Sequence, residues 1–230
     1  MKIELVVFDM AGTTVRDDDA VNQCLRDALQ AGGVEVTRGE VNEVMGIPKP
    51  TAIAALLTRK RPGENVAPAD EVDRLHTDFL RRMIAFYRTE AGVTEMPGAS
   101  AVFAQLKAAG VKVALDTGFS RAIADVVLER LDWSRPGVLD ATVASDEVPR
   151  GRPHPDLIFE AMKRAGVTER GHVAKVGDTP ADLQEGTAAG CALVIGVTNG
   201  THSLTQLQVH PHTHLVGSLA ELLPLILPGL

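Results

Sequence analysis

Short apolar runs alternate with amphipathic stretches along most of the chain. Five runs are rich in β-branched residues and are flanked by small ones: residues 3–8, 111–117, 138–145, 172–178 and 191–197. Four helical stretches lie beside them: residues 100–110, 120–131, 155–166 and 180–190. Strands that are apolar throughout are typical of parallel sheets buried on both faces. The pattern therefore predicts an α/β fold, with a Rossmann-like parallel sheet that has helices on both faces.

One region breaks this alternation, because no strand is indicated between Arg16 and Glu95. It holds only helical patterns, at residues 20–33, 50–60 and 69–90. Pro97 and Gly98 then return the chain to the alternating pattern as a hinge. We expect a core formed by residues 1–15 plus 97–230, and an inserted all-helical cap domain over residues 16–96.

Composition narrows the class of protein. With 230 residues and 45% hydrophobic content, the chain can bury one large core and a smaller insert. A formal net charge of -7 excludes a broad positive field, so no nucleic acid is expected as a partner. The two cysteines have no metal-ligand spacing and fit a reducing compartment. No apolar run has the length of a membrane span, so we expect a cytoplasmic protein without a membrane partner.

Polar residues that can bind phosphate and metal fall at strand ends. Asp9, Thr117 and Asp178 each end a predicted strand, where ligands sit in parallel α/β folds. Gly12 lets backbone amides approach a phosphoryl group near Asp9. Asp182 follows Asp178 by four residues. Grouped carboxylates suit Mg²⁺, although helix capping explains this pair equally well.

Two further residues complete the candidate chemistry. Thr117 offers a hydroxyl to an anion, and Arg152, just ahead of a Pro-initiated helix, can neutralise a transferring phosphoryl group. An exposed loop arginine is the plain alternative. Asp116 points away from Thr117 by two-residue alternation and is left out of the site. The acidic run at residues 16–19 is interpreted as a solvated segment with a helix N-cap.

Taken together and in this order, the four motifs resemble the haloacid dehalogenase superfamily over essentially the whole chain. The resemblance implies that Asp9 attacks phosphorus and forms an aspartyl-phosphate, and that the segment after the first strand is the family's cap. It further implies that Asp9, the backbone carbonyl of Ala11 and Asp178 hold Mg²⁺, with Asp182 behind them and Lys175 as an ion-pair partner of the acids. The residues expected to hold the phosphoryl oxygens are Gly12, Thr13, Thr117, Gly118 and Arg152.

Within the superfamily, the chain is similar to the phosphonatase branch. Ala11 replaces the usual second acid, the string "DMAGTT" recurs, and Arg152 stands where lysine is usual. The segment "VMGIPK" resembles the one in which phosphonatases carry a lysine that forms a Schiff base, which would be Lys49. Three other positions depart from that branch: Ala52 where a cap histidine is expected, Asp19 near an early cysteine, and Phe119 for a tyrosine.

The absence of a second acid at Ala11 and the presence of Lys49 in the cap are both consistent with a single reaction. A phosphomonoesterase benefits from an acid that protonates the leaving oxygen, and Ala11 cannot supply it. Cleavage of a carbon–phosphorus bond expels a carbanion, which needs an electron sink, and an imine on Lys49 is such a sink. The predicted substrate is phosphonoacetaldehyde or a related 2-oxoalkylphosphonate.

Other functions remain open from sequence. Lys49 can be a solvated cation that grips a small phosphate ester, as in a phosphatase of the phosphoglycolate type. A catalytically idle binding protein with the same fold is a second alternative. A dehalogenase and a phosphomutase are disfavoured, the latter by Ala11. The resemblance suggests a homodimer.

Overall fold

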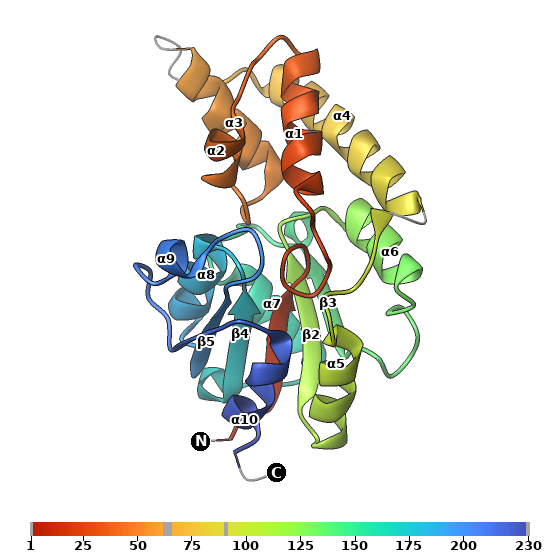
Figure 1. Ribbon diagram of the computed structural model, residues 1–230, viewed down its shortest axis with the longest axis vertical. Coiled ribbons are helices and arrows are strands. Elements are labelled where there is room, and N and C mark those ends of the chain that lie inside the picture. The colour runs from red at the N-terminus through yellow and green to blue at the C-terminus, as the bar shows by residue number, and fades with distance from the viewer. Residues whose placement is uncertain (1, 62–65, 90–91, 229–230) are drawn as a thin grey trace.

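Six parallel strands form the central sheet of the computed structural model, which describes residues 2–61, 66–89 and 92–228 (Figure 1). The strands are β1 (Leu5–Asp9), β2 (Lys112–Thr117), β3 (Ala141–Ala144), β4 (Val173–Gly177), β5 (Leu193–Val197) and β6 (His214–Val216). Their order is β3-β2-β1-β4-β5-β6. The predicted α/β fold with a parallel sheet is confirmed. Since the chain order reverses between β1 and β4, the crevice for a ligand lies at the carboxyl ends of these two strands.

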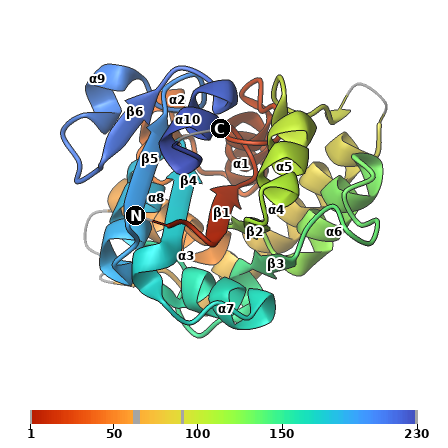
Figure 2. The same cartoon turned by 90° about the horizontal axis from the view of Figure 1, so that it is seen from below.

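Alternate residues of β1 pack on opposite faces of the sheet. Phe8 meets Phe103 of α5 (Ala99–Ala108) with 5.2 Å between ring centroids. Val7 belongs instead to the apolar cluster that contains Leu157 of α7 (Asp156–Ala165). Figure 2 shows α5 and α7 on the two sides of the sheet. Both faces are therefore covered, which explains why the strands are apolar throughout.

The remaining helices of the core complete the two layers. They are α6 (Arg121–Arg130), α8 (Pro180–Ala189), α9 (Leu204–Leu207) and α10 (Leu222–Ile226). Helix α8 packs on β4 and β5. It begins at a capping box formed by Thr179 and Asp182. Helix α10 lies in the apolar C-terminal stretch, and residues 229 and 230 lie outside the described part of the chain.

Four helices lie above the carboxyl ends of the strands (Figure 1). They are α1 (Ala20–Ala31), α2 (Arg38–Asn42), α3 (Lys49–Lys60) and α4 (Ala69–Arg88). Three of them match predicted helices; Glu90, the predicted end of the last, is outside the described residues. Helix α2 was missed, although Thr37 and Glu40 form a capping box with the spacing that marks a helix start. The division of domains at residues 16 and 96 stays a prediction.

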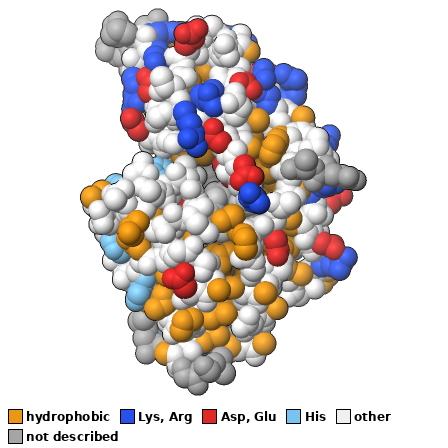
Figure 3. Space-filling view, viewed as in Figure 1, with side chains coloured by type: hydrophobic (Ala, Val, Ile, Leu, Met, Phe, Trp, Pro, Cys, Tyr) orange, Lys and Arg blue, Asp and Glu red, His pale blue; other side chains and the backbone are white. Residues whose placement is uncertain are grey.

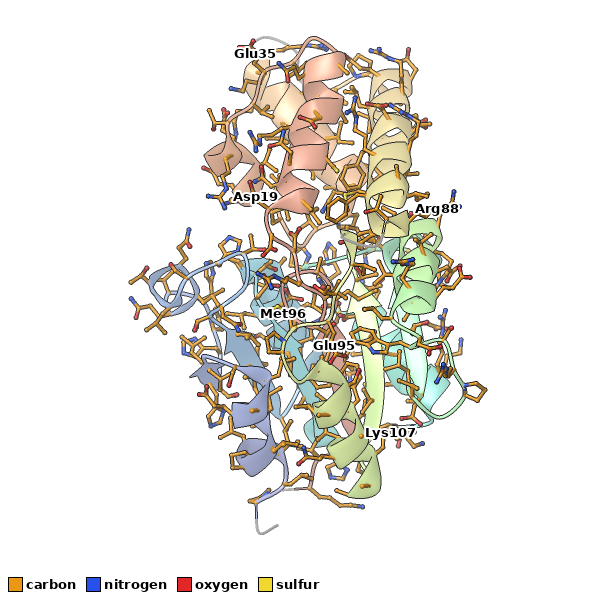
Figure 4. All side chains as sticks on the ribbon, turned by 45° about the vertical axis from the view of Figure 1, so that its right-hand side comes forward. Asp19, Glu35, Arg88, Glu95, Met96 and Lys107 are labelled. Carbon is orange, nitrogen blue, oxygen red and sulfur yellow. The ribbon has the colours of Figure 1, made fainter. Side chains whose placement is uncertain are left out.

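The two connections between the core and these four helices run side by side. Val15 and Glu95 form an antiparallel bridge. The Arg16 N–H donates to the Thr94 carbonyl at 2.9 Å, and the Met96 N–H donates to the Thr14 carbonyl at 2.8 Å. Figure 4 shows Asp19 at the lower end of α1, with Glu95 and Met96 below it. One β-bridge and two backbone hydrogen bonds thus hold the two crossings together, so the connection between the core and the four helices is narrow.

The outer surface differs between the two parts. Figure 3 shows charged side chains of both signs over the upper helices, whereas the lower face of the core is largely apolar or uncharged. Many of the cap charges are paired, for example Arg59 with Glu43 at 2.7 Å. Within the described residues, no helix combines the length and apolar character that crossing a membrane requires.

Candidate active site

A tight turn after β1 sets the position of Asp9, the last residue of that strand. The N–H groups of Thr13, Thr14 and Val15 all donate to the Met10 carbonyl, at 3.2, 2.9 and 2.7 Å. Gly12 has a φ of 91°, which disfavours any residue with a side chain. A Cβ atom at Gly12 would also lie 2.3 Å from Asp178 Oδ2. Glycine is therefore required for this turn to approach the end of β4.

Asp178 follows β4 and is held from two sides. Thr13 Oγ1 donates to its Oδ1 at 2.9 Å, and the Thr201 N–H donates to its Oδ2 at 2.6 Å. Gly200 permits the second contact, because a Cβ atom there would lie 2.4 Å from Oδ2. Thr13 was expected to bind phosphoryl oxygens, and here its hydroxyl orients Asp178. Thr201 carried no motif in the sequence and was missed.

Three buried carboxylates lie together at this point. Oxygens of Asp9, Asp178 and Asp182 are within 4.8 Å of one another. Burial raises the pKa of Asp9 to about 8 and that of Asp178 to about 6, because the charged form loses its water. A hard divalent cation would offset this crowding of negative charge, and oxygen ligands of this kind suit one. The donor set thus fits the metal site expected from sequence at Asp9 and Asp178, with the Ala11 backbone lining the cavity beside them.

Arg152 lies at the centre of the acids and is itself buried. Its Nη1 donates to Asp9 Oδ1 at 2.6 Å and lies 3.0 Å from Asp182 Oδ1. Its Nε donates to Glu185 Oε2 at 2.9 Å, and its Nη2 donates to Asp116. The pKa of Arg152 is raised well above its usual value by these four acids, although burial opposes the effect. The alternative of an exposed loop arginine is wrong.

Lys175, on β4, is the second buried cation of this cluster. Its Nζ lies 3.2 Å from Asp182 Oδ1 and 3.0 Å from Glu185 Oε2, and it also donates to Asp116. The expected pairing of Lys175 with acids is present. Asp116, Asp182 and Glu185 form a second close group of carboxylates, but the ammonium of Lys175 already contacts all three. Lys175 therefore supplies the positive charge for this second group of carboxylates.

Asp116 was left out of the predicted site, which was wrong, because its neighbours in the structure belong to that site. Asp116 does alternate with Thr117 along β2, but its register partner on β1 is Asp9. Paired residues of parallel strands point to the same face, so the side chain of Asp116 lies beside that of Asp9. Glu185 was also missed; it lies three residues after Asp182 on α8, on the same side of the helix. Both residues could have been found by asking which positions face Asp9.

Thr117 and Gly118 end β2 at the edge of the same cavity. Thr117 is buried and its Oγ1 accepts the Phe119 N–H at 3.1 Å. A Cβ atom at Gly118 would lie 2.9 Å from the carbonyl oxygen of Gly46 in the cap. Gly118 therefore allows the cap loop to touch the end of β2. Both residues line the same cavity as Asp9.

Lys49, at the start of α3, reaches the cavity from the cap. Its side chain is buried, with 4% exposed. Its Nζ lies 6.0 Å and 5.9 Å from the ring centroids of Phe79 and Phe119. Among the described residues, no carboxylate oxygen lies within 4.0 Å of this ammonium. The solvated loop lysine considered as an alternative is wrong, since Lys49 is enclosed by aromatic rings.

The surroundings of Lys49 change its protonation. Burial lowers its pKa from 10.5 to about 8, and the charges of Asp17 and Asp9 partly oppose this. Asp17 belongs to the acidic run interpreted as solvated, and it is half-buried instead. Its Oδ1 accepts the Val21 N–H at 3.0 Å, which caps α1. An appreciable fraction of Lys49 is therefore a free amine near neutral pH.

The cavity between cap and core is narrow. It is lined by Asp9, Ala11, Thr117 and Arg152 from the core and by Lys49 from the cap, and its volume is about 20 Å³. That is room for about one water molecule. The cap loop closes it, because Gly46 and Gly118 are in contact and a Cβ atom at Gly46 would lie 2.3 Å from Thr179 Oγ1. A substrate larger than a water molecule does not fit this cavity as it stands.

Comparison with known proteins places this geometry in a family. Residues 3–190 match the profile of the haloacid dehalogenase-like hydrolases. The chain is 32% identical over 221 residues to the phosphonoacetaldehyde hydrolase of Bacillus cereus, covering 91% of this chain and 81% of that protein. It is 30% identical over 214 residues to the enzyme of the same name from Bacillus anthracis, covering 89% of this chain and 79% of the other.

Solved structures show the same fold at lower identity. A phosphonoacetaldehyde hydrolase-like protein from Oleispira antarctica superposes with a TM-score of 0.81 at 22% identity, covering 98% of this chain and 92% of that one. A candidate phosphoglycolate phosphatase from Lactobacillus delbrueckii subsp. bulgaricus gives 0.79 at 23% identity, covering 98% and 99%. Proteins named for different activities thus share the architecture, so the fold does not choose between them.

Proposed function

The chain belongs to the haloacid dehalogenase-like hydrolase family, and on that premise we propose that it is a Mg²⁺-dependent phosphonatase. The proposed reaction cleaves the carbon–phosphorus bond of phosphonoacetaldehyde or a related 2-oxoalkylphosphonate. One observation carries the proposal: buried Lys49, with no carboxylate oxygen within 4.0 Å among the described residues, lines the same narrow cavity as the nucleophile Asp9. The 32% identical relative named phosphonoacetaldehyde hydrolase supports it.

The phosphoryl half of the reaction uses the core. Asp9 attacks phosphorus and forms an aspartyl-phosphate, which water later hydrolyses to phosphate. Thr117, Gly118 and the turn at Gly12 and Thr13 contact the phosphoryl oxygens, and Arg152 offsets their charge. Asp9, Asp178 and the Ala11 carbonyl would hold Mg²⁺, with Asp182 and Lys175 behind them. The ion would supply further positive charge at the phosphoryl oxygens.

The carbon half uses the cap. The Lys49 amine attacks the aldehyde carbon, and loss of water gives a protonated imine. When Asp9 displaces the carbon from phosphorus, the electron pair of the broken bond moves into the imine and leaves a neutral enamine. Protonation of the enamine carbon and hydrolysis of the imine release acetaldehyde and restore Lys49. Every electron pair and proton of the step is then accounted for.

This division of labour explains why the site has no second acid at Ala11. The enamine leaves without needing a proton at the moment of bond cleavage, so a general acid beside Asp9 adds nothing. A free amine is needed instead, and burial of Lys49 between Phe79 and Phe119 supplies it by lowering its pKa to about 8. Closure of the cap also keeps water from the imine until cleavage is complete.

Trapping with borohydride tests the proposal. The protein is incubated with phosphonoacetaldehyde and Mg²⁺, reduced, and mapped by peptide mass spectrometry, while acetaldehyde is measured in an unreduced sample. We expect a reduced adduct on Lys49 together with acetaldehyde release, and neither in Lys49→Arg. Lys60→Arg, on the exposed side of the same helix, is the matched control and should behave as the wild type. Absence of any adduct would refute the imine.

A phosphatase for a small phosphate monoester is the second candidate, favoured by one observation. Two aromatic rings, those of Phe79 and Phe119, lie 6.0 and 5.9 Å from Lys49 Nζ, and neither can transfer a proton during imine formation. Lys49 would then grip the substrate as a cation. Ready hydrolysis of phosphoglycolate without an adduct would favour this function. If neither substrate is turned over and Mg²⁺ with phosphate gives no thermal stabilisation, the chain is an idle binding protein.

A further inference from the structure

We propose that Asp116 and Glu185 are positioning residues that fix the guanidinium of Arg152 against Asp9. The inference rests on the proposed phosphoryl transfer at Asp9 and adds two residues that never touch the substrate. They act only through Arg152. Neither residue belongs to the motifs by which the site was found, and Asp116 was set aside on sequence grounds.

Three sides of the Arg152 guanidinium have separate acceptors. Nε donates to Glu185 at 2.9 Å, Nη2 donates to Asp116, and Nη1 donates to Asp9 at 2.6 Å and also lies 3.0 Å from Asp182 Oδ1. A planar guanidinium held at two nitrogens has a fixed plane and direction for the third. Asp116 and Glu185 therefore decide where Nη1 points, and it points at the nucleophile.

The two positioning acids are themselves held by the fold. Asp116 lies on β2 opposite Asp9 in the register of the sheet, and Glu185 projects from α8. Lys175 bridges them from below, donating to Asp116 and lying 3.0 Å from Glu185 Oε2. Helix α8 sits close enough for these contacts because Gly186 packs on Lys175; a Cβ atom there would lie 2.9 Å from Lys175 Cβ. Strand β2, helix α8 and the buried Lys175 thus hold Arg152 in a fixed position.

This arrangement explains why an arginine is used here. A lysine ammonium is a point charge on a flexible stem and has no plane that two anchors could orient. With Asp116 and Glu185 in place, a lysine at position 152 would be drawn toward these acids and away from Asp9. We therefore expect Arg152→Lys to lose the positioning that the two acids provide.

A double-mutant cycle in steady-state kinetics tests the inference. Asp116→Asn keeps the side-chain volume and should lower kcat by about ten- to hundred-fold, because a misdirected charge costs this much, with a much smaller change in KM. In an Arg152→Lys background the same substitution should cost less than about three-fold, since the two residues act as one unit. Asp125→Asn, an exposed acid on α6, is the control and should be silent. Equal losses in both backgrounds would overturn the inference.

Chemical rescue provides a second readout that does not depend on the stability of one variant. Guanidinium chloride at millimolar concentration should raise the turnover of Arg152→Ala about ten-fold, because the anchoring acids bind it. It should restore none in Arg152→Ala combined with Glu185→Gln. Equal rescue in both would also overturn the inference. The borohydride adduct on Lys49 should persist in Asp116→Asn, so loss of positioning is distinguished from failure of the imine chemistry.

Discussion

Lys175 in the core and Lys49 in the cap are both buried. They differ in almost every other property. Lys175 has three carboxylate neighbours and Lys49 has none within 4.0 Å among the described residues. The pKa of Lys175 is raised by Asp116, Glu185 and Asp182 against the effect of burial. That of Lys49 is lowered to about 8 because burial dominates. Because both lysines are equally buried, their neighbouring acids decide which of them keeps its charge.

The two lysines therefore have different roles in the site. The core lysine is a permanent cation that offsets the acids needed for phosphoryl chemistry. The cap lysine can lose its proton and act as a nucleophile. The loop that precedes Lys49 packs against Gly118 and Thr179.

The largest expected effect comes from removing the core cation. Lys175→Met leaves three buried carboxylates facing one another, which should lower the free energy of unfolding by about 3–5 kcal/mol. Urea denaturation followed by circular dichroism measures it. Lys163→Met, an exposed lysine paired with Glu160, is the control and should change little. A loss below about 1 kcal/mol in Lys175→Met would contradict the structural role.

The corresponding change in the cap should have the opposite sign. Lys49→Met removes an unpaired buried charge and should raise the free energy of unfolding at pH 7 by about 1–3 kcal/mol, the upper figure being the shift of the Lys49 pKa expressed as energy. The unfolded chain keeps this proton up to pH 10.5 and the folded protein only up to about 8. The gain should therefore be complete below pH 8 and vanish above pH 10.5.

Denaturation of Lys49→Met and wild type at pH 7 and at pH 10.5 measures this difference. Lys60→Met is the matched control on the same helix, because Lys60 is partly exposed and paired with Glu40 at 2.7 Å. Turnover should be abolished in Lys49→Met and unchanged in the control. A destabilised Lys49→Met would show that the lysine has a structural partner.

If Lys49 reacts as the free amine, the rate of imine formation must depend on pH. The initial rate of borohydride trapping on Lys49 should rise about ten-fold between pH 7 and pH 9, because the uncharged fraction grows through a pKa of about 8. Quenched-flow reduction with quantification of the labelled peptide gives this profile. A rate that is flat or that falls over this range would remove the support for Lys49 as the imine former.

The smallest expected effect is a shift of that profile by Asp17. The charge of Asp17 raises the pKa of Lys49, so Asp17→Asn should move the profile toward lower pH. Asp18→Asn changes the exposed neighbour, which pairs with Arg16, and should leave the profile in place. Movement toward higher pH in Asp17→Asn would mean that another group controls the charge of Lys49.

The sequence predicted what depends on local pattern. Apolar runs specified five of the six strands, and the residues that end them placed Asp9, Thr117 and Asp178 at one edge of the sheet. Lys49 was found through its segment, but its burial was not, since that depends on Phe79 of α4 and Phe119, which follows β2, coming together. A single chain pattern does not reveal such a contact.

Residues that act by facing another strand or helix were harder to predict. Asp116 was excluded because it was compared with its neighbour Thr117 and not with Asp9 across the sheet. Glu185 was available by helical spacing from Asp182. Thr201 contributes only a backbone N–H to Asp178, so its side chain gave no signal. Register and loop geometry, which sequence specifies only indirectly, decide all three.

The most direct test of the account is the mass of the adduct trapped on Lys49 in wild type and in Asp9→Asn. With phosphonoacetaldehyde and borohydride, the wild type should yield an N-ethyl lysine, because the carbon–phosphorus bond is broken before reduction. Asp9→Asn cannot accept the phosphoryl group, so it should yield an N-(2-phosphonoethyl) lysine that still carries phosphorus. An N-ethyl adduct in Asp9→Asn, or no adduct on Lys49 in either protein, would contradict the account.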